Sequence, residues 1–318
     1  MSTLRSAITA MPRFVDIGAN LLDERFTEGM YHGKVRHEPD FVQVVERACH
    51  IGMRHMVLTA GSLEDSRAAV PKVRELREAN TTKCQFYCTV GVHPTRCNEF
   101  LEKDADKHLQ ALIDIAKDGM RDGTVAAVGE MGLDYDRLEF CPKEIQQTYF
   151  EKQLELAKET GLPLFLHNRN VGSDVYDILS NNKDKWSKAV VHSFDDSIEL
   201  ANKFIELGDI YIGLNGCSLR TPENLKVASQ IDLSRILLET DAPYCEVKKT
   251  HSGYEFVKTF FPTKPEKKYE PGSCVKGRNE PCHIVQVAEV IAGVRGITVE
   301  ELADACYENS LRLYGWKQ

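Results

Sequence analysis

Apolar and polar positions form blocks along the chain, and the blocks follow two different periods. Short apolar runs predict buried strands, and longer stretches with apolar residues three and four positions apart predict amphipathic helices. Eight strand-like runs are present, ending near residues 18, 59, 91, 130, 167, 192, 214 and 241. Predicted helices follow the strands in turn, at 40–51, 63–79, 105–117, 143–160, 173–180, 197–207, 224–230, 281–292 and 299–314.

Eight strands that are each followed by a helix predict an α/β protein, a single closed (β/α)8 TIM barrel. A doubly wound sheet would stop at five or six strands and carry a glycine-rich turn after the first, whereas the sequence from Asp16 to Asn20 is not GxGxxG. We expect one barrel domain at 13–318, after a flexible N-terminal extension at 1–12. The one long irregular stretch, 245–279, falls after the eighth strand, and such loops are usually functional.

Four of the predicted strands end on a residue that can bind a metal. The runs finish at Glu130, His167, His192 and Asp241, and glycines bracket Glu130 on both sides. A barrel brings the carboxyl ends of its strands to one mouth, so the four side chains should share a cavity. Two imidazoles and two carboxylates suit a divalent ion such as Zn²⁺, Mn²⁺ or Mg²⁺. The alternative is that each is a separate structural residue, and the placement of all four favours a metal site at this face.

Three further residues are candidates for the same cavity. His93 follows the third strand. It could be another metal ligand or a group that transfers a proton, and the alternative is a hydrogen-bonded loop residue. Asn20, after the first strand, could contact a metal-bound water or only cap a turn. Arg169 suits a phosphate because its guanidinium is planar, and the alternative is a surface ion pair.

Charge and composition narrow the class of protein. The net charge is −8, but residues 245–278 carry eight basic and four acidic residues, and five aromatic residues lie among them. Lysines beside aromatic rings favour contact with single-stranded nucleic acid, and the alternative is that the rings anchor the loop to the barrel. No apolar run is long enough for a membrane span, and we expect no secretory signal because the first thirteen residues lack an apolar stretch. Ten cysteines without CxxC spacing are typical of reduced thiols, so we expect cytosol or nucleus, with an organelle transit peptide as the alternative.

The ordered set of motifs resembles the TatD family of metal-dependent deoxyribonucleases over nearly the whole chain. The segments that carry the resemblance are 16–21, 91–94, 129–135, 166–169, 192–194, 239–244, 278–281 and 309–315. The resemblance implies a (β/α)8 barrel that binds one or two divalent ions, Mg²⁺ first and Zn²⁺ or Mn²⁺ as alternatives, through Glu130, His167, His192 and Asp241. Many members carry a His-x-His pair on strand one. Here those positions are Gly18 and Asn20, as in the eukaryotic branch, so a second ion would be held more weakly.

The implied activity is hydrolysis of DNA phosphodiesters from the 3′ end, mainly at single-stranded ends, with roles in DNA repair or apoptotic DNA degradation. Glu130 would lie on the metal or bridge two ions, and Asp241 or His93 would handle the proton of the attacking water. The DNA would be bound by Asn20, Arg169, Arg278 and the basic loop. Three alternatives stay open from the residues: an amidohydrolase acting on a cyclic amide or lactone, a noncatalytic interaction barrel, and a phosphosugar isomerase.

Overall fold

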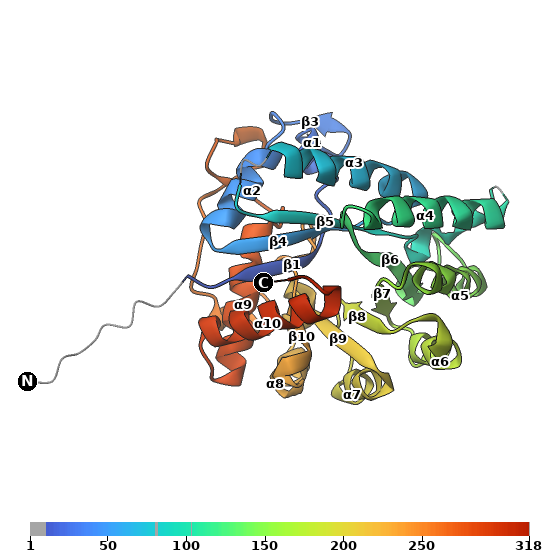
Figure 1. Ribbon diagram of the computed structural model, residues 1–318. Helices are drawn as coiled ribbons and strands as arrows, with labels where there is room; N and C mark the ends of the chain where they lie inside the picture. Colours follow the sequence, from blue (N-terminus) through green and yellow to red (C-terminus); the bar gives the residue numbers. More distant parts are fainter. Residues whose placement is uncertain (1–10, 80–81, 103, 318) are drawn as a thin grey trace, which may run out of the picture.

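The computed structural model describes residues 11–79, 82–102 and 104–317, and its centre is a barrel of eight parallel strands (Figure 1). In sheet order the strands are β1 (Phe14–Ala19), β4 (Met53–Leu58), β5 (Gln85–Val90), β6 (Val125–Asp134), β7 (Leu164–Arg169), β8 (Lys188–His192), β9 (Asp209–Leu214) and β10 (Ile236–Leu238). The predicted single (β/α)8 barrel is therefore confirmed. The part of the predicted N-terminal extension at residues 1–10 lies outside the described residues.

Helices surround the strands and cover their outer faces (Figure 1). The surrounding helices are α2 (Phe41–His50), α3 (Leu63–Ala79), α4 (Ala105–Met120), α5 (Lys143–Thr160), α6 (Asp174–Asn181), α7 (Ile198–Leu207), α8 (Pro222–Gln230), α9 (Ile284–Arg295) and α10 (Val299–Tyr314). A short helix α1 (Glu24–Thr27) and a hairpin of β2 (Met30–Tyr31) and β3 (Lys34–Val35) fill the connection after β1. The predicted helices match the observed ones to within a few residues at either end.

Two layers of apolar side chains hold the barrel together. The larger lies between strands and helices, and a smaller one fills the barrel with residues such as Ile17, Phe165 and Tyr211. Helix α10 closes the amino ends of the strands, where the Asn309 side chain donates to the carbonyl of Ile236 at 2.9 Å. The carboxyl ends of the strands remain open for a site.

The first and last strands meet at a seam that the β-ladder does not close. Asp241 N donates to Gly18 O at 2.8 Å, and Asn20 N donates to Ala242 O at 2.7 Å. The buried carboxylate of Asp16 also accepts a hydrogen bond from Thr240 N at 3.0 Å. These bonds, made by residues around the strand ends, complete the barrel.

Three strand ends differ from the prediction by two residues or more, and one of them is β7, which continues two residues beyond His167 to Arg169. Strand β6 continues four residues beyond Glu130, to Asp134, and β10 ends at Leu238, three residues before Asp241. Glycine is required on both sides of Glu130, because Gly129 and Gly132 have φ values of 137° and 140° and a Cβ there would collide with the carbonyls of Phe165 and His167.

The long segment after β10 is ordered by short elements. It contains two short helical turns, η6 (Ser252–Phe256) and η7 (Glu266–Lys268), and the two-stranded sheet of β11 (Thr263–Lys264) and β12 (Cys274–Val275). It reaches α9 through the helical turn η8 (Pro281–His283).

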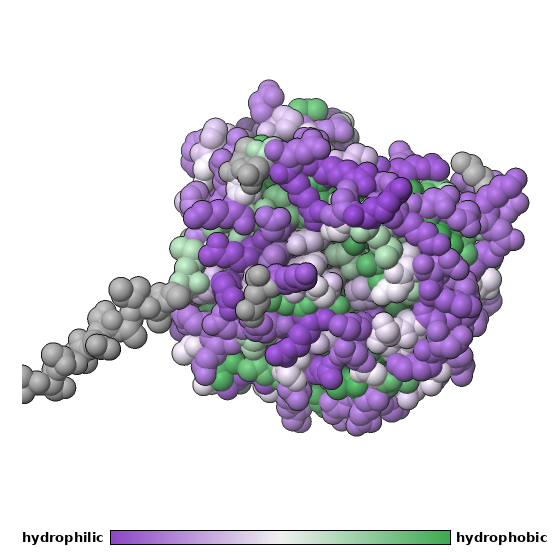
Figure 2. Space-filling view, viewed as in Figure 1, coloured by the Kyte–Doolittle hydropathy of each residue, from purple (hydrophilic) through white to green (hydrophobic). Residues whose placement is uncertain are grey.

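Among the described residues no single helix is long and apolar enough to cross a bilayer. The one pair of neighbouring helices that passes by length and composition, Pro281–Arg295 with Val299–Tyr314, is bent by 110°. On the face shown in Figure 2 the surface is mostly hydrophilic, and hydrophobic residues lie in small separate patches.

Candidate metal centre

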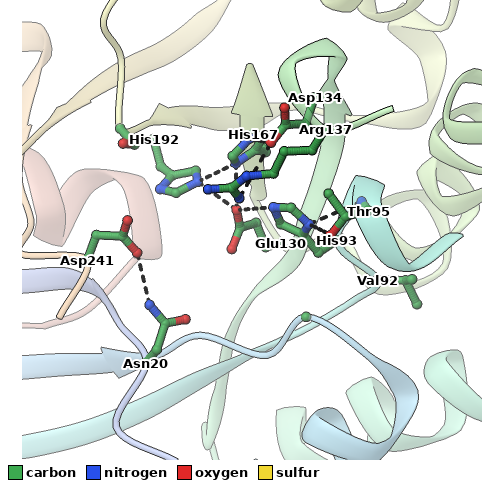
Figure 3. Close-up of polar contacts among 12 residues, drawn as sticks. Asn20, Val92, His93, Thr95, Glu130, Asp134, Arg137, His167, His192 and Asp241 are labelled. Carbon is green, nitrogen blue, oxygen red and sulfur yellow. Dashed lines mark hydrogen bonds and ion pairs between the residues drawn. The ribbon is translucent and has the colours of Figure 1, made fainter. Parts of the chain in front are cut away.

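Glu130 lies at the centre of a cluster of three imidazoles at the open end of the barrel (Figure 3). Its Oε1 atom is 2.7 Å from His167 Nδ1, 2.8 Å from His192 Nε2 and 3.3 Å from His93 Nε2. The four side chains come from β6, β7, β8 and the residue before η1 (Pro94–Phe100). The structure thus brings together three of the four predicted ligands, and places His93 with them.

The spacing of these atoms fits a divalent ion. Glu130 Oε1, His167 Nδ1 and His192 Nε2 form a triangle with edges of 2.7, 2.8 and 3.2 Å. Two ligands at right angles and about 2.1 Å from a metal would be about 3.0 Å apart. One carboxylate oxygen and two imidazole nitrogens at this spacing can therefore occupy one face of a coordination shell.

A second carboxylate lies beside each of the two histidines His167 and His192. Asp134 Oδ2 lies 3.1 Å from His167 Nε2, and Glu239 Oε2 lies 3.4 Å from His192 Nδ1. Histidines that bind metals usually donate their other ring nitrogen to such an acceptor, which fixes the ring and its tautomer. The sequence analysis did not identify Asp134 and Glu239 as site residues, although both lie inside its motif segments.

Asp241 and Asn20 face the cluster from the other side of the cavity (Figure 3). Asn20 Nδ2 donates to Asp241 Oδ1 at 2.9 Å, so Asn20 orients this carboxylate. A side chain at Gly18 would lie 2.9 Å from Phe165 Cζ and 3.1 Å from Glu239 Oε2. A side chain at this position of β1 would need Phe165 and Glu239 to move, and Gly18 itself offers no ligand atom.

Burial and neighbouring charges set the ionisation of the cluster. Burial opposes a charged Glu130, but His192 and His93 outweigh it and hold the pKa of this carboxyl well below its ordinary value. The pKa of His192 is well above its usual range, because the charges of Glu130 and Glu239 overcome the cost of burial. Burial raises the pKa of Asp241 to about 6. Of these two carboxyl groups, Glu130 is thus ionised near neutral pH, and Asp241 is the one that can exchange a proton there.

Four arginines line the same cavity, which has a volume of about 490 Å³. They are Arg96, Arg137, Arg169 and Arg220. The Nε atom of Arg169 is buried and lacks a hydrogen-bond partner among the described residues, so it is available to a bound anion. Arg169 lies where the sequence analysis placed it. The other three were missed because arginines in loops look like ordinary surface charges in a sequence.

The structure corrects the predicted role of Arg278. This side chain is 1% exposed and does not line the cavity. Its guanidinium donates to Asp40 at 2.5 and 2.7 Å and to Glu280 at 2.8 Å. Arg278 is committed to a buried ion-pair cluster and is not a substrate-binding residue.

The basic aromatic loop also differs from its prediction. Tyr254, Phe256 and Phe261 pack against the main core, and Tyr269 stacks on His37 with ring centroids 4.4 Å apart. Phe260, 61% exposed, is the exception. No described residue between 246 and 279 lines the cavity. The alternative interpretation, that most of these rings anchor the loop, is the one that the structure supports.

Comparison with known proteins agrees with this geometry. The family model described as TatD related DNase matches residues 15–315. The chain is 42% identical to the Schizosaccharomyces pombe protein named deoxyribonuclease Tat-D, over 98% of this chain and 99% of that protein. It is 31% identical to the Edwardsiella piscicida 3′-5′ ssDNA/RNA exonuclease TatD, over 94% of this chain and 98% of that one. A crystal structure of a TatD-family hydrolase from Entamoeba histolytica superimposes with a TM-score of 0.88 at 35% identity, covering 96% and 99% of the two chains.

The barrel and its mouth of imidazoles, carboxylates and arginines define a metal-dependent hydrolase. The matches extend over almost the entire length of the chain. The chain belongs to the TatD-related DNase family.

Proposed function

We propose that this enzyme removes nucleotides from the 3′ end of single-stranded DNA by hydrolysing phosphodiester bonds. The observation that carries the proposal is one cavity that combines the Glu130 cluster with four arginines. Hydrolysis of a phosphodiester needs both a centre that activates water and cations that bind the phosphate. The bacterial relative is named a 3′-5′ ssDNA/RNA exonuclease, and this supports cleavage from the 3′ end.

The residues of the chain have separable tasks in this reaction. When bound, the divalent ion would lower the pKa of water and polarise the phosphoryl oxygen. Glu130, His167 and His192 would hold it, and His93 would complete the cluster, since its Nδ1 is 2.7 Å from Thr95 Oγ1 and its Nε2 faces Glu130. Asp241, held by Asn20, accepts the proton of the attacking water. Because Asp241 is the carboxylate with the raised pKa, we assign the base to it and not to His93.

The size and charge of the cavity favour a strand end over a duplex. A volume of about 490 Å³ is in the range of small-ligand pockets, so it accommodates a terminal nucleotide and excludes a double helix. A neutral cyclic amide or lactone would leave the buried Nε of Arg169 without an anionic partner, which argues against such a substrate. The proposal also includes Mg²⁺ as the divalent metal, with Zn²⁺ or Mn²⁺ as alternatives. It further includes a role in DNA repair or apoptotic DNA degradation and a location in the cytosol or nucleus.

The test is release of nucleotides from single-stranded DNA labelled at the 3′ or the 5′ end, with Mg²⁺, Mn²⁺ or Zn²⁺ added. We expect early release of the 3′ label, and a loss of at least ~100-fold in Glu130→Gln and in Asp241→Asn, equivalent to about 2.7 kcal/mol of transition-state stabilisation. Glu159→Gln, an exposed carboxylate on α5 paired with Lys117, is the matched control and should keep full activity. Early release of the 5′ label would overturn the polarity. Unchanged rates in both site variants would overturn the assignment of the site.

A further inference from the structure

A second cluster of metal-binding side chains lies outside the cavity, where the long segment after β10 reaches α9. Cys274 on β12 and Cys282 and His283 of η8 each offer one ligand atom, and these atoms all lie within 4.8 Å of one another. Both cysteines are buried, at 1% and 0% exposure, and His283 is half-buried. None of the three lines the cavity that holds Glu130.

The distance between the sulfur atoms fits a tetrahedral metal. Cys274 Sγ and Cys282 Sγ are 3.9 Å apart. Two thiolates that bind one Zn²⁺ ion at about 2.3 Å, at the tetrahedral angle, are about 3.8 Å apart. Soft sulfur ligands combined with imidazole select Zn²⁺ over Mg²⁺ or Ca²⁺.

One ring nitrogen of His283 has a hydrogen-bond partner in either tautomer. Its Nδ1 accepts from the backbone nitrogen of Glu280 at 3.0 Å or, when protonated, donates to Asn279 Oδ1, also at 3.0 Å. The second tautomer leaves Nε2 unprotonated for an ion, and Glu280 N then donates to Asn279 Oδ1 at 3.1 Å. Because the ring is half-buried, water can take the fourth tetrahedral position.

Charge in the surrounding cluster is consistent with a bound dication. Arg47 and Arg278 pair with the carboxylates of Asp40 and Glu280, so these four groups balance one another. These four groups are neutral overall and leave no unpaired cation among them, so a dication bound by two thiolates would balance its own charge without disturbing the ion pairs.

We propose that Cys274, Cys282 and His283 form a structural Zn²⁺ site that fastens the segment after β10 to the start of α9. The site would act on the catalytic end of the barrel through Asn279, whose side chain donates to Thr240 O at 2.8 Å and whose backbone donates to Pro243 O at 3.1 Å. Both acceptors neighbour Asp241. A zinc ion here thus fixes the backbone that carries the catalytic carboxylate, without touching the substrate.

The experiment uses the full-length protein, purified under reducing conditions and loaded with Co²⁺ in place of its metals. Cobalt bound to thiolates gives an intense near-ultraviolet charge-transfer absorption that imidazole and carboxylate ligands do not give. We expect this absorption at one equivalent of Co²⁺ per chain, lost in Cys274→Ser and in Cys282→Ser. It should persist in Cys306→Ser, a control at an equally buried cysteine on α10, and in Glu130→Gln.

Cys245→Ser separates this site from the catalytic centre, because Cys245 Sγ is 3.2 Å from Asp241 Oδ2. Loss of the absorption in Cys245→Ser alone would overturn the proposal, as would its absence from folded wild-type protein. A second measurement needs no variant that might misfold: a mercurial titrated into the wild type as purified should release one equivalent of Zn²⁺, measured with a chromophoric chelator. Release of no zinc, or a Cys274–Cys282 disulfide mapped by mass spectrometry in the protein as purified, would equally refute the site.

Discussion

Replacing Arg278 by Met tests whether this arginine holds the fold or the substrate. The substitution removes the guanidinium that donates to Asp40 and Glu280, while the Met side chain retains an apolar stem over Phe26. Asp40 and Glu280 are 1% and 0% exposed, and Arg47 alone would remain to compensate two buried carboxylates. Removing one partner of such a buried pair costs about 3–5 kcal/mol.

The expected loss converts into a measurable melting shift. The entropy of unfolding is about 2.1 cal/mol/K per residue, or about 0.7 kcal/mol/K for 318 residues. The Arg278→Met variant should therefore melt about 4–8 °C below the wild type in calorimetry, and its KM for single-stranded DNA should be unchanged at temperatures where it is folded.

Arg121→Met provides the control, because Arg121 forms an ion pair with Asp118 at 2.6 Å on a surface where its side chain is 77% exposed. Exposed pairs contribute about 1 kcal/mol or less, so this variant should melt within about 1–2 °C of the wild type. If Arg278→Met melted like the control and raised KM severalfold, Arg278 would be a substrate-binding residue and the interpretation of the structure would be wrong.

Two further substitutions test the support of the site and the seam of the barrel. Asp134→Asn removes the charge 3.1 Å from His167 Nε2 and should weaken Mn²⁺ binding by about 10- to 100-fold in calorimetric titration; equal affinities would show that this carboxylate does not support the ligand. Burial raises the pKa of Asp16 from 3.8 to about 7, so its contribution to stability is complete below pH 4 and is lost as the pH rises to 7. Asp16→Asn keeps an oxygen for Thr240 N but cannot ionise. In urea titrations the wild type should lose up to about 4 kcal/mol of unfolding free energy between pH 4 and 7 that the variant does not lose. Identical pH profiles of the two proteins would refute this reasoning.

The sequence predicted the barrel because each strand and helix is recorded in a local pattern. Apolar runs placed Glu130, His167 and His192 on neighbouring parallel strands, and parallel strands bring their carboxyl ends together whatever lies between them. The exact ends of the strands could not be predicted as well from the sequence. Strand β6 continues past Glu130 through alternating small and large residues, and no local signal separates this continuation from a loop.

The errors concern partners that are distant in the sequence. Arg278 pairs with Asp40, which lies 238 positions away, and nothing near Arg278 distinguishes a buried ion pair from a phosphate contact. The aromatic residues of the loop after β10 were ambiguous for the same reason, since burial depends on the helices that they meet. Arg96, Arg137 and Arg220 have no strand-end position to mark them, so only the folded cavity shows that they act together.

The seam between β1 and β10 makes assembly of the site inseparable from closure of the barrel. The hydrogen bonds that join the two ends of the sheet involve Gly18, Asn20, Thr240, Asp241 and Ala242. The residues that close the barrel therefore also form part of the cavity wall. If this seam opened, Asp241 would lose its fixed position opposite Glu130 even with all eight strands in place. Substitutions that loosen the contact between β1 and the residues after β10 should therefore disturb the cavity as well as the barrel.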